Sequence, residues 1–222
     1  NIIVALIIVW QYREKIKRFK MFSTIAAVSL LIMIGGSLFS DNIASKIEGS
    51  LYRDQVIYSK QTPYQHIVMT RHKDDLRLFI DGNLQFSSMD EYRYHECLVH
   101  IPMMATPKKE NILILGGGDG LAARELLKYD EVKKITLVDL DAEIVALCKQ
   151  DKGVSTLNEG ALSNEKVHVV TQDGYKYLEE SDELFDVIII DLPDPNNETL
   201  NKLYTDVFYR LAANHLESTG AM

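Results

Sequence analysis

Cysteine is scarce in this sequence: Cys97 and Cys148 are the only two among 222 residues. They form neither a CxxC pair nor any spacing typical of a metal site. Each falls in an apolar stretch with helical periodicity, which predicts buried, reduced thiols. We therefore expect no disulfide, and we assign no metal ligands and no metal cofactor.

Basic residues are also in short supply. The chain has 24 Lys and Arg against 32 Asp and Glu, a net charge of −8. Residues 1–40 hold five of the basic side chains and one acid, so the rest of the chain carries about −12. Nucleic-acid-binding domains collect basic side chains on one face, so this balance argues against a nucleic-acid partner and suits a cationic substrate. The sequence shows no internal repeats or low-complexity tracts.

Charge is missing altogether from residues 1–10 and residues 21–40. The second run is long enough to cross a bilayer, which needs about 20 apolar residues, and the first looks like the end of another crossing. A buried or amphipathic helix is the alternative, but residues 26–39 are apolar on nearly every face. We predict a multi-pass transmembrane helical region over residues 1–40.

Two features bear on which side of the membrane the following domain faces. The basic segment at residues 11–20 predicts a cytoplasmic loop, which would send the following domain outside. The cofactor inferred below is cytoplasmic, and we favour a cytoplasmic domain on that ground. Because the chain starts at Asn1 and stops at Met222, where a strand is expected to begin, we interpret it as a fragment that lacks C-terminal strands.

Three further segments follow the membrane region. Residues 41–62 are polar and predict a juxtamembrane connector. Residues 63–108 predict an N-terminal β-hairpin segment and a linking helix, with Asp81-Gly82 as a tight turn. Within that segment we expect strands at 64–70, 76–80 and 84–86, and a helix at 91–100 that ends near Pro102 and Pro107.

Residues 109–222 alternate aliphatic strands with helical patterns. Continuous apolar strands are typical of a buried parallel sheet, so the fold class is α/β, a doubly wound Rossmann-like sheet of the S-adenosylmethionine-dependent methyltransferase type. We expect strands at 112–115, 134–138, 167–171 and 185–190, and helices at 121–129, 142–150, 175–179 and 200–216, the second of them capped by Asp141.

A glycine cluster separates the first strand from its helix. Residues 116–120 read Gly-Gly-Gly-Asp-Gly, and glycines at this place let the backbone approach a ligand at a helix N-terminus. Asp119 sits inside the turn, where it would repel a phosphate and hold an amine. The turn therefore indicates a cationic ligand rather than a dinucleotide.

Acids follow all four expected strands. Ligands of such sheets bind beyond the carboxyl ends of the strands, and like charges gathered there are costly unless a cation compensates them. Asp139 lies 23 residues after Gly116, which is the usual place of a ribose-binding acid. The alternative is that its charge complements the positive N-terminal end of the next helix. Asp173-Gly174 fits either an adenine-binding group or a plain turn. Asp191 and Asp194 lie on a prolyl loop after the fourth strand.

Over residues 62–220 the chain resembles spermidine synthase, the polyamine aminopropyltransferase family. The order and intervals of several motifs carry this resemblance. They are Tyr64-Gln65-His66, Leu78-Phe79-Ile80-Asp81-Gly82, Asp90-Glu91-Tyr92-Arg93-Tyr94-His95-Glu96, Gly116-Gly117-Gly118-Asp119-Gly120, Asp139-Leu140-Asp141, Asp173-Gly174 and Asp191-Leu192-Pro193-Asp194-Pro195.

The resemblance implies transfer of the aminopropyl group of decarboxylated S-adenosylmethionine to a di- or polyamine, putrescine to spermidine above all, with release of methylthioadenosine. It implies catalytic roles for Asp191, the proton acceptor, and Tyr94. The implied cofactor-binding residues are Gln65, Gly116, Gly118, Asp119, Asp139, Asp173 and Gly174. The implied substrate-binding residues are Tyr64, His95, Asp119, Asp191 and Asp194.

Three departures and one further implication accompany the resemblance. Residues 196–200 replace the usual Gly-Pro-Ala segment, the soluble family members lack a membrane segment, and the sequence ends before the last strands of the family. Family members are commonly dimers or tetramers, which implies a possible homodimer.

Two other functions stay open from the residues alone. An S-adenosylmethionine-dependent methyltransferase would share the sheet, the glycine turn and Asp139, but it leaves Asp119, Tyr94 and the Asp191–Asp194 pair unexplained. A non-catalytic polyamine-sensing domain of a membrane protein would bind the same amines without using Asp191 or Tyr94.

Overall fold

The computed structural model describes residues 18–38, 54–195 and 198–222, together with positions 4, 7, 10, 11, 51 and 52. The chain forms two compact units, residues 1–53 and 54–222. The first contains α2 (Phe19–Leu38), whose window Phe19–Gly36 is long and apolar enough to cross a membrane by length and composition. Most of the first predicted span and of the basic segment lies outside the described residues.

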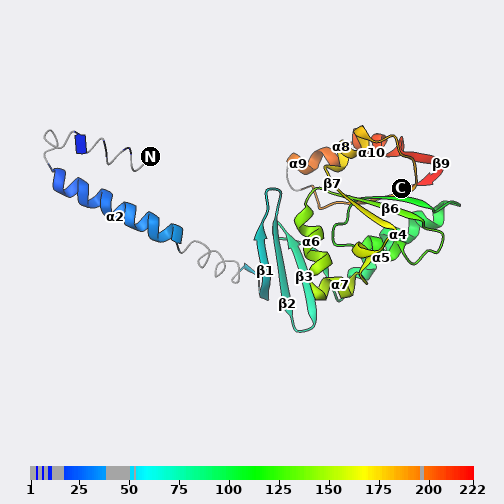
Figure 1. Ribbon diagram of the computed structural model, residues 1–222, viewed down its shortest axis with the longest axis horizontal. Helices are drawn as coiled ribbons and strands as arrows, with labels where there is room; N and C mark the ends of the chain where they lie inside the picture. The colour runs from blue at the N-terminus through cyan, green and yellow to red at the C-terminus, as the bar shows by residue number, and fades with distance from the viewer. Residues whose placement is uncertain are drawn as a thin grey trace. The chain divides into compact units, whose positions relative to one another are not determined.

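The second unit begins with a four-stranded antiparallel sheet in the order β1-β2-β3-β4 (Figure 1). Asp81 and Gly82, with φ of 49° and 80°, make the tight turn between β3 and β4, as the sequence predicts. The strands are β1 (Gln55–Gln61), β2 (His66–His72), β3 (Asp75–Ile80) and β4 (Asn83–Ser87).

Strand β1 corrects the prediction of a polar connector over residues 41–62. Its side chains are exposed or half-buried, and its apolar residues, Val56, Ile57 and Tyr58, are consecutive rather than alternating, so the sequence gives no strand pattern here. Its backbone pairs along its length with β2, from Gln55 opposite Arg71 to Gln61 opposite His66. Backbone pairing, rather than burial of side chains, makes this segment a strand.

Helix α4 (Glu91–Ala105) runs past Pro102, where the sequence predicts its exit. Proline removes one backbone hydrogen bond, but Val99 and Met103 on either side of it are fully buried and hold the helix together. Cys97 on the same helix is exposed, against the prediction of a buried thiol, whereas Cys148 is buried.

A five-stranded parallel sheet in the order β7-β6-β5-β8-β9 forms the body of this unit. Its elements follow the predicted alternation closely. The strands are β5 (Asn111–Gly116), β6 (Lys134–Asp139), β7 (Val167–Thr171), β8 (Phe185–Asp191) and β9 (Leu216–Ala221). The helices are α5 (Leu121–Leu126), α6 (Ala142–Gln150), α7 (Lys152–Leu157), α8 (Gly174–Glu180), α9 (Glu198–Asn201) and α10 (Asp206–Ala213), with single 3-10 turns η1 (Ala161–Ser163) and η2 (Lys202–Tyr204).

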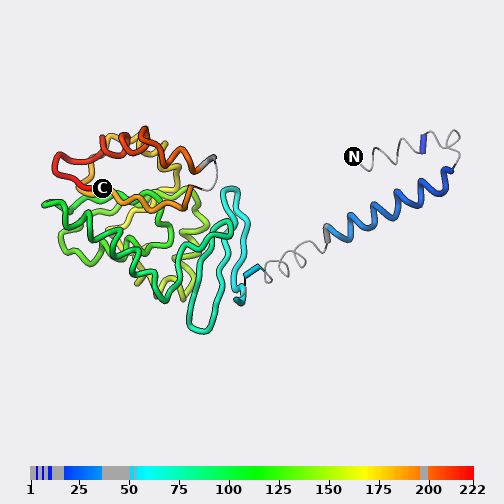
Figure 2. The backbone as a smooth tube through the Cα atoms, turned by 180° about the vertical axis from the view of Figure 1, so that it is seen from behind, coloured from blue at the N-terminus to red at the C-terminus, as the bar shows by residue number. Residues whose placement is uncertain are grey.

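Helices cover both faces of the parallel sheet, which Figure 2 shows from behind. Alternate residues of β5 point to opposite faces: Ile112 and Ile114 pack in the larger core with α4, α5 and α6, whereas Leu113 and Leu115 pack with α8 and α10. All four are fully buried. Because this central strand is packed on both faces, it holds the start of the glycine turn in a fixed position at the end of the sheet.

The single helix predicted at residues 200–216 is wrong. The chain there forms α9, η2, α10 and the start of β9. The break occurs because the hydroxyl of Thr205 accepts a hydrogen bond from the Phe208 N–H at 3.2 Å and so caps a new helix.

Candidate active site

The glycine turn lies against the end of β8. Gly116 pairs with Asp191 in the sheet, and the N–H of Gly117 donates to the Asp191 carbonyl at 3.0 Å. A Cβ on Gly116 would lie 2.0 Å from that carbonyl oxygen, and the residue has φ of +84°. Only glycine fits here, and the close approach brings Asp119 and Asp191 to the same edge of the sheet.

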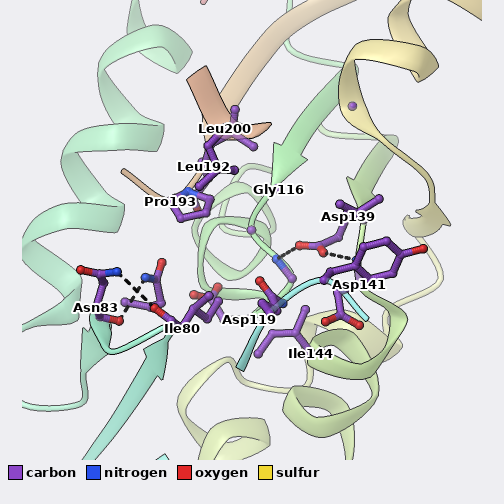
Figure 3. Close-up of a pocket in the computed structure, with 18 of the residues that line it drawn as sticks. Ile80, Asn83, Gly116, Asp119, Asp139, Asp141, Ile144, Leu192, Pro193 and Leu200 are labelled. Carbon is purple, nitrogen blue, oxygen red and sulfur yellow. Dashed lines mark hydrogen bonds between the residues drawn. The ribbon is translucent and has the colours of Figure 1, made fainter. Parts of the chain in front are cut away.

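A cavity of about 600 Å³ opens at this edge (Figure 3). Every site residue predicted from the sequence lines it, together with apolar side chains such as Ile144, Leu192 and Pro193. The predicted residues are Tyr64, Gln65, Tyr94, His95, Gly116, Gly118, Asp119, Asp139, Asp173, Gly174, Asp191 and Asp194.

Asp139 ends β6 with both carboxylate oxygens facing backbone donors. One oxygen accepts from the Gly118 N–H at 3.0 Å and the other from the Asp141 N–H at 2.9 Å. A Cβ at Gly118 would lie 2.5 Å from the first of these oxygens. The glycine turn therefore holds this carboxylate in place, with lone pairs left for hydroxyl groups of a ligand.

One imidazole and two carboxylates form a compact group beside the turn. The nitrogen and oxygen atoms of His95, Asp119 and Asp191 that face one another all lie within 4.8 Å. The Tyr94 hydroxyl donates to Asp191 Oδ1 at 2.9 Å, and the Tyr94 ring, half-exposed, meets His95 edge-on. Several hydrogen-bond acceptors, two of them carboxylates, thus lie close together, which favours binding of a cation.

The pKa values of these carboxyls reflect their crowding. Burial raises the pKa of Asp191 to about 6; the charge of Asp119 adds to the rise, while His95 and the Tyr94 hydroxyl oppose it. Burial likewise raises the pKa of Asp119, against the opposing effect of His95. A group with a pKa near neutrality can take up and release a proton at working pH.

Two neighbouring groups are shifted in the same direction. Burial raises the pKa of Asp139 to about 6, although the N–H groups of Asp141 and Gly118 oppose the rise. Burial and the charge of Asp191 raise the pKa of Tyr94, so its phenol stays a hydrogen-bond donor.

Asp173 is already engaged by the protein itself. One oxygen caps α8 by accepting from the Tyr175 and Lys176 N–H groups, and the other meets Lys202 Nζ at 2.5 Å. Burial alone would raise its pKa, but Lys202 and the N–H donors outweigh burial and lower it. These contacts are what the alternative of a plain turn predicts. If Asp173 also binds adenine, its carboxylate does so while it caps α8 and pairs with Lys202.

Several side chains that support the cavity give no sequence signal. The hydroxyl of Thr62 donates to Asp141 Oδ2 at 2.7 Å and accepts from the N–H groups of Tyr64 and Gln65, each at 3.1 Å. It thereby ties the turn that carries Gln65 to the start of α6. Only the contact across 79 residues reveals this role, because a threonine at a strand end is unremarkable in the sequence.

Comparison with known proteins agrees with this geometry. Residues 91–222 match the family model described as the spermine/spermidine synthase domain. The chain belongs to this family. Curated relatives include polyamine aminopropyltransferases of Oceanobacillus iheyensis, 48% identical, and Leptospira interrogans, 46% identical; the alignments cover 100% of this chain and 43% and 45% of those relatives.

Solved structures of the family have the same fold. A spermidine synthase in complex with the transition state analogue AdoDATO is 33% identical, with a TM-score of 0.69 over 73% of this chain and 55% of that one. Spermidine synthase from Thermotoga maritima gives a TM-score of 0.67 at 33% identity, over 73% of this chain and 54% of that one. The chain thus spans less than half the length of the curated relatives quoted and just over half of these solved chains.

Proposed function

We propose that this chain carries the cofactor site and the reacting carboxylates of a polyamine aminopropyltransferase. The reaction moves the aminopropyl group of decarboxylated S-adenosylmethionine to a di- or polyamine, putrescine above all, and releases methylthioadenosine. The observation that carries the proposal is the group of His95, Asp119 and Asp191, which shares one cavity with Asp139 in a chain of this family.

The cofactor would lie across the carboxyl ends of the strands. Asp139 accepts hydrogen bonds from the ribose hydroxyls, and Gly116 and Gly118 let the backbone approach the ligand. Gln65 and Gly174 complete the methylthioadenosine pocket together with Asp173. Their shared position on the wall of the cavity supports this assignment.

The chemistry requires an amine to attack the carbon beside a sulfonium. An ammonium has no lone pair, and free alkyl amines titrate near about 10.4, so the acceptor must lose a proton in the site. Asp191 receives that proton as the nitrogen–carbon bond forms and the carbon–sulfur bond breaks, and the Tyr94 hydroxyl at 2.9 Å holds its carboxylate in line. Asp194 and Tyr64 bind the acceptor chain at the rim.

Asp119 favours the decarboxylated cofactor over ordinary S-adenosylmethionine. The decarboxylated tail ends in an ammonium alone, which the carboxylates attract. The ordinary cofactor adds a carboxylate to the same tail, and Asp119 and Asp191 would repel it in a partly buried site. A methyltransferase would gain nothing from this arrangement.

Calorimetric titration of the chain with the two cofactor forms tests the proposal. We expect the decarboxylated form to bind at least about tenfold more tightly, since one repelled charge in such a site is worth more than ~1.4 kcal/mol. Asp119→Asn should remove most of that preference and leave methylthioadenosine binding unchanged, because methylthioadenosine has no ammonium. Tighter binding of the ordinary cofactor would identify a methyltransferase instead.

We further propose how the chain is organised and located. Residues 63–108 serve, together with β1, as the substrate-facing β segment, and residues 109–222 serve as the catalytic domain. Helix α2 belongs to a multi-pass membrane region over residues 1–40, and the catalytic domain faces the cytoplasm, as a cytoplasmic cofactor requires. Two copies of the protein form a homodimer, as the resemblance to the family implies.

A further inference from the structure

A buried ion pair lies beneath the carboxylates of the site. Arg124 on α5 and Glu91 on α4 are 7% and 6% exposed. The guanidinium meets Glu91 with two prongs, Nη1 to Oε1 at 2.8 Å and Nη2 to Oε2 at 3.1 Å. Arg124 also donates to Glu125 at 2.9 Å and to the Leu157 carbonyl at 2.8 Å. Few rotamers satisfy all four contacts, so the Glu91 carboxylate is held rigidly.

Glu91 determines which nitrogen of His95 carries hydrogen. Nδ1 of His95 lies 2.9 Å from Glu91 Oε2 and 2.9 Å from the Glu91 carbonyl oxygen. Both are acceptors, so Nδ1 must be the donor, and in the neutral ring Nε2 then has a free lone pair. Nε2 lies 4.0 Å from Asp119 Oδ2, and the ring is 2% exposed and cannot turn freely.

We propose that Glu91, held by Arg124, is a positioning residue that keeps Nδ1–H of His95 toward itself and so presents Nε2 to the substrate as a hydrogen-bond acceptor. The inference rests on the proposed function, because the substrate group in question is the primary ammonium that Asp119 and Asp191 attract: that of the aminopropyl tail of the cofactor or, when methylthioadenosine occupies the site, that of a diamine. His95 then completes a set of three acceptors for that ammonium, and Arg124 and Glu91 act only through it.

The spacing of the three acceptors fits a primary ammonium. Three acceptors placed about 2.8 Å from one nitrogen, at tetrahedral angles, lie ~4.6 Å from one another. The facing atoms of His95, Asp119 and Asp191 are within 4.8 Å of one another. A primary ammonium has three N–H donors and can use all three acceptors, whereas a secondary amine has one donor fewer. The site therefore selects a terminal amino group.

Nitrogen-15 NMR of the unliganded chain measures the tautomer of His95 without any substrate. Two-bond proton–nitrogen correlations distinguish the two neutral tautomers, and His95→Gln identifies the signal. We expect neutral His95 to carry its hydrogen on Nδ1. A hydrogen on Nε2 would overturn the proposal whether or not the protein proves to be an aminopropyltransferase.

Substitution of Glu91 tests whether this residue positions His95 for the substrate. The measured quantity is the affinity for putrescine in the presence of methylthioadenosine. Glu91→Met removes the side-chain acceptor and leaves Nδ1–H only the backbone carbonyl of residue 91, so putrescine binding should weaken by up to about tenfold, as it does when a metal-ligating histidine loses its orienting partner. Glu91→Gln keeps an oxygen for Nδ1–H and should lose no more than about threefold. Glu96→Met, on an exposed position of the same helix, is the matched control and should bind like the parent.

The outcomes distinguish the positioning role of Glu91 from the identity of the substrate. Equal affinity in the parent, Glu91→Met and Glu91→Gln would refute the positioning role. An Nδ1–H tautomer in a parent chain that does not bind putrescine would contradict the proposed substrate and leave the orientation of His95 established. If Glu91→Met does not fold, the tautomer of the parent still decides: hydrogen on Nδ1 supports the positioning role, and hydrogen on Nε2 overturns it.

Discussion

Asp191 combines two demands that oppose each other. As the proposed base it must be ionised to receive a proton, yet its surroundings favour the neutral form. Burial and the neighbouring charge of Asp119 raise its pKa from 3.8 to about 6. Its affinity for a proton is therefore higher than that of an exposed carboxylate, which helps it take a proton from an amine. The same surroundings make its ionised form costly for folding.

That cost predicts a stability gain in Asp191→Asn. Because the pKa is higher in the folded than in the unfolded chain, ionisation destabilises the fold as pH rises from about 4 to about 6. Above pH 6 the variant should unfold with about 1–3 kcal/mol more free energy than the parent, and below pH 4 the difference should vanish. Transfer of the aminopropyl group should be lost, with methylthioadenosine affinity nearly intact.

Urea unfolding at pH 4 and pH 8, with product formation measured on the full-length protein, checks both effects. Asp182→Asn removes an exposed carboxylate and should change neither. A variant at position 191 that kept most of its turnover would show that another group accepts the proton.

At the scale of elements, the antiparallel sheet and the parallel sheet meet at the cavity. Lys60 on β1 pairs with Glu143 on α6 at 2.6 Å, and Thr62 just after β1 bonds Asp141 at the start of α6. Lys60 is half-exposed, so its ion pair contributes little. Thr62 and Asp141 are buried, and their hydrogen bond is the contact that sets Gln65 against the parallel sheet.

Thr62→Val should therefore weaken methylthioadenosine binding. The valine keeps the shape but loses the hydroxyl, which leaves Asp141 Oδ2 and the Tyr64 and Gln65 N–H groups without this partner. We expect an affinity loss of about tenfold and a destabilisation of about 1–3 kcal/mol. Isothermal titration and urea unfolding measure these.

Thr62→Ser provides the control, since it retains the hydroxyl and should bind nearly like the parent. Equal affinity of the valine and serine variants would mean that Gln65 is placed by other contacts or does not touch the ligand.

At the scale of the whole molecule, the chain combines a cavity-bearing α/β unit with an apolar helix. None of the window Phe19–Gly36 is buried within the protein, although it contains many large apolar side chains. Apolar surface of this extent is unfavourable in water, which favours an apolar environment for the helix.

We expect the chain to co-sediment with phospholipid vesicles and the unit 54–222 to remain in solution. Val28→Arg places a charge near the centre of the helix, which costs about 3 kcal/mol in a membrane, and should reduce association strongly. Equal sedimentation of the unit 54–222 would show that the α/β unit itself binds lipid and that α2 is not the anchor.

The sequence by itself determined the order of strands and helices in residues 109–195 and the acids at their ends. Those features are local: an aliphatic run, a glycine turn and a helix pattern are each written in consecutive residues. The carboxyl ends of parallel strands share one edge, so the sequence alone assigns Asp119, Asp139, Asp173 and Asp191 to one crevice.

Only the tertiary structure decided which side chains support that crevice. Glu91 and Arg124 are 33 residues apart, Asp173 and Lys202 are 29 apart, and Thr62 and Asp141 are 79 apart. Strand β1 likewise exists because β2 pairs with its backbone, not because its side chains alternate. Contacts between distant residues leave no periodic signal in a single sequence, because each partner satisfies the other only after the chain has folded.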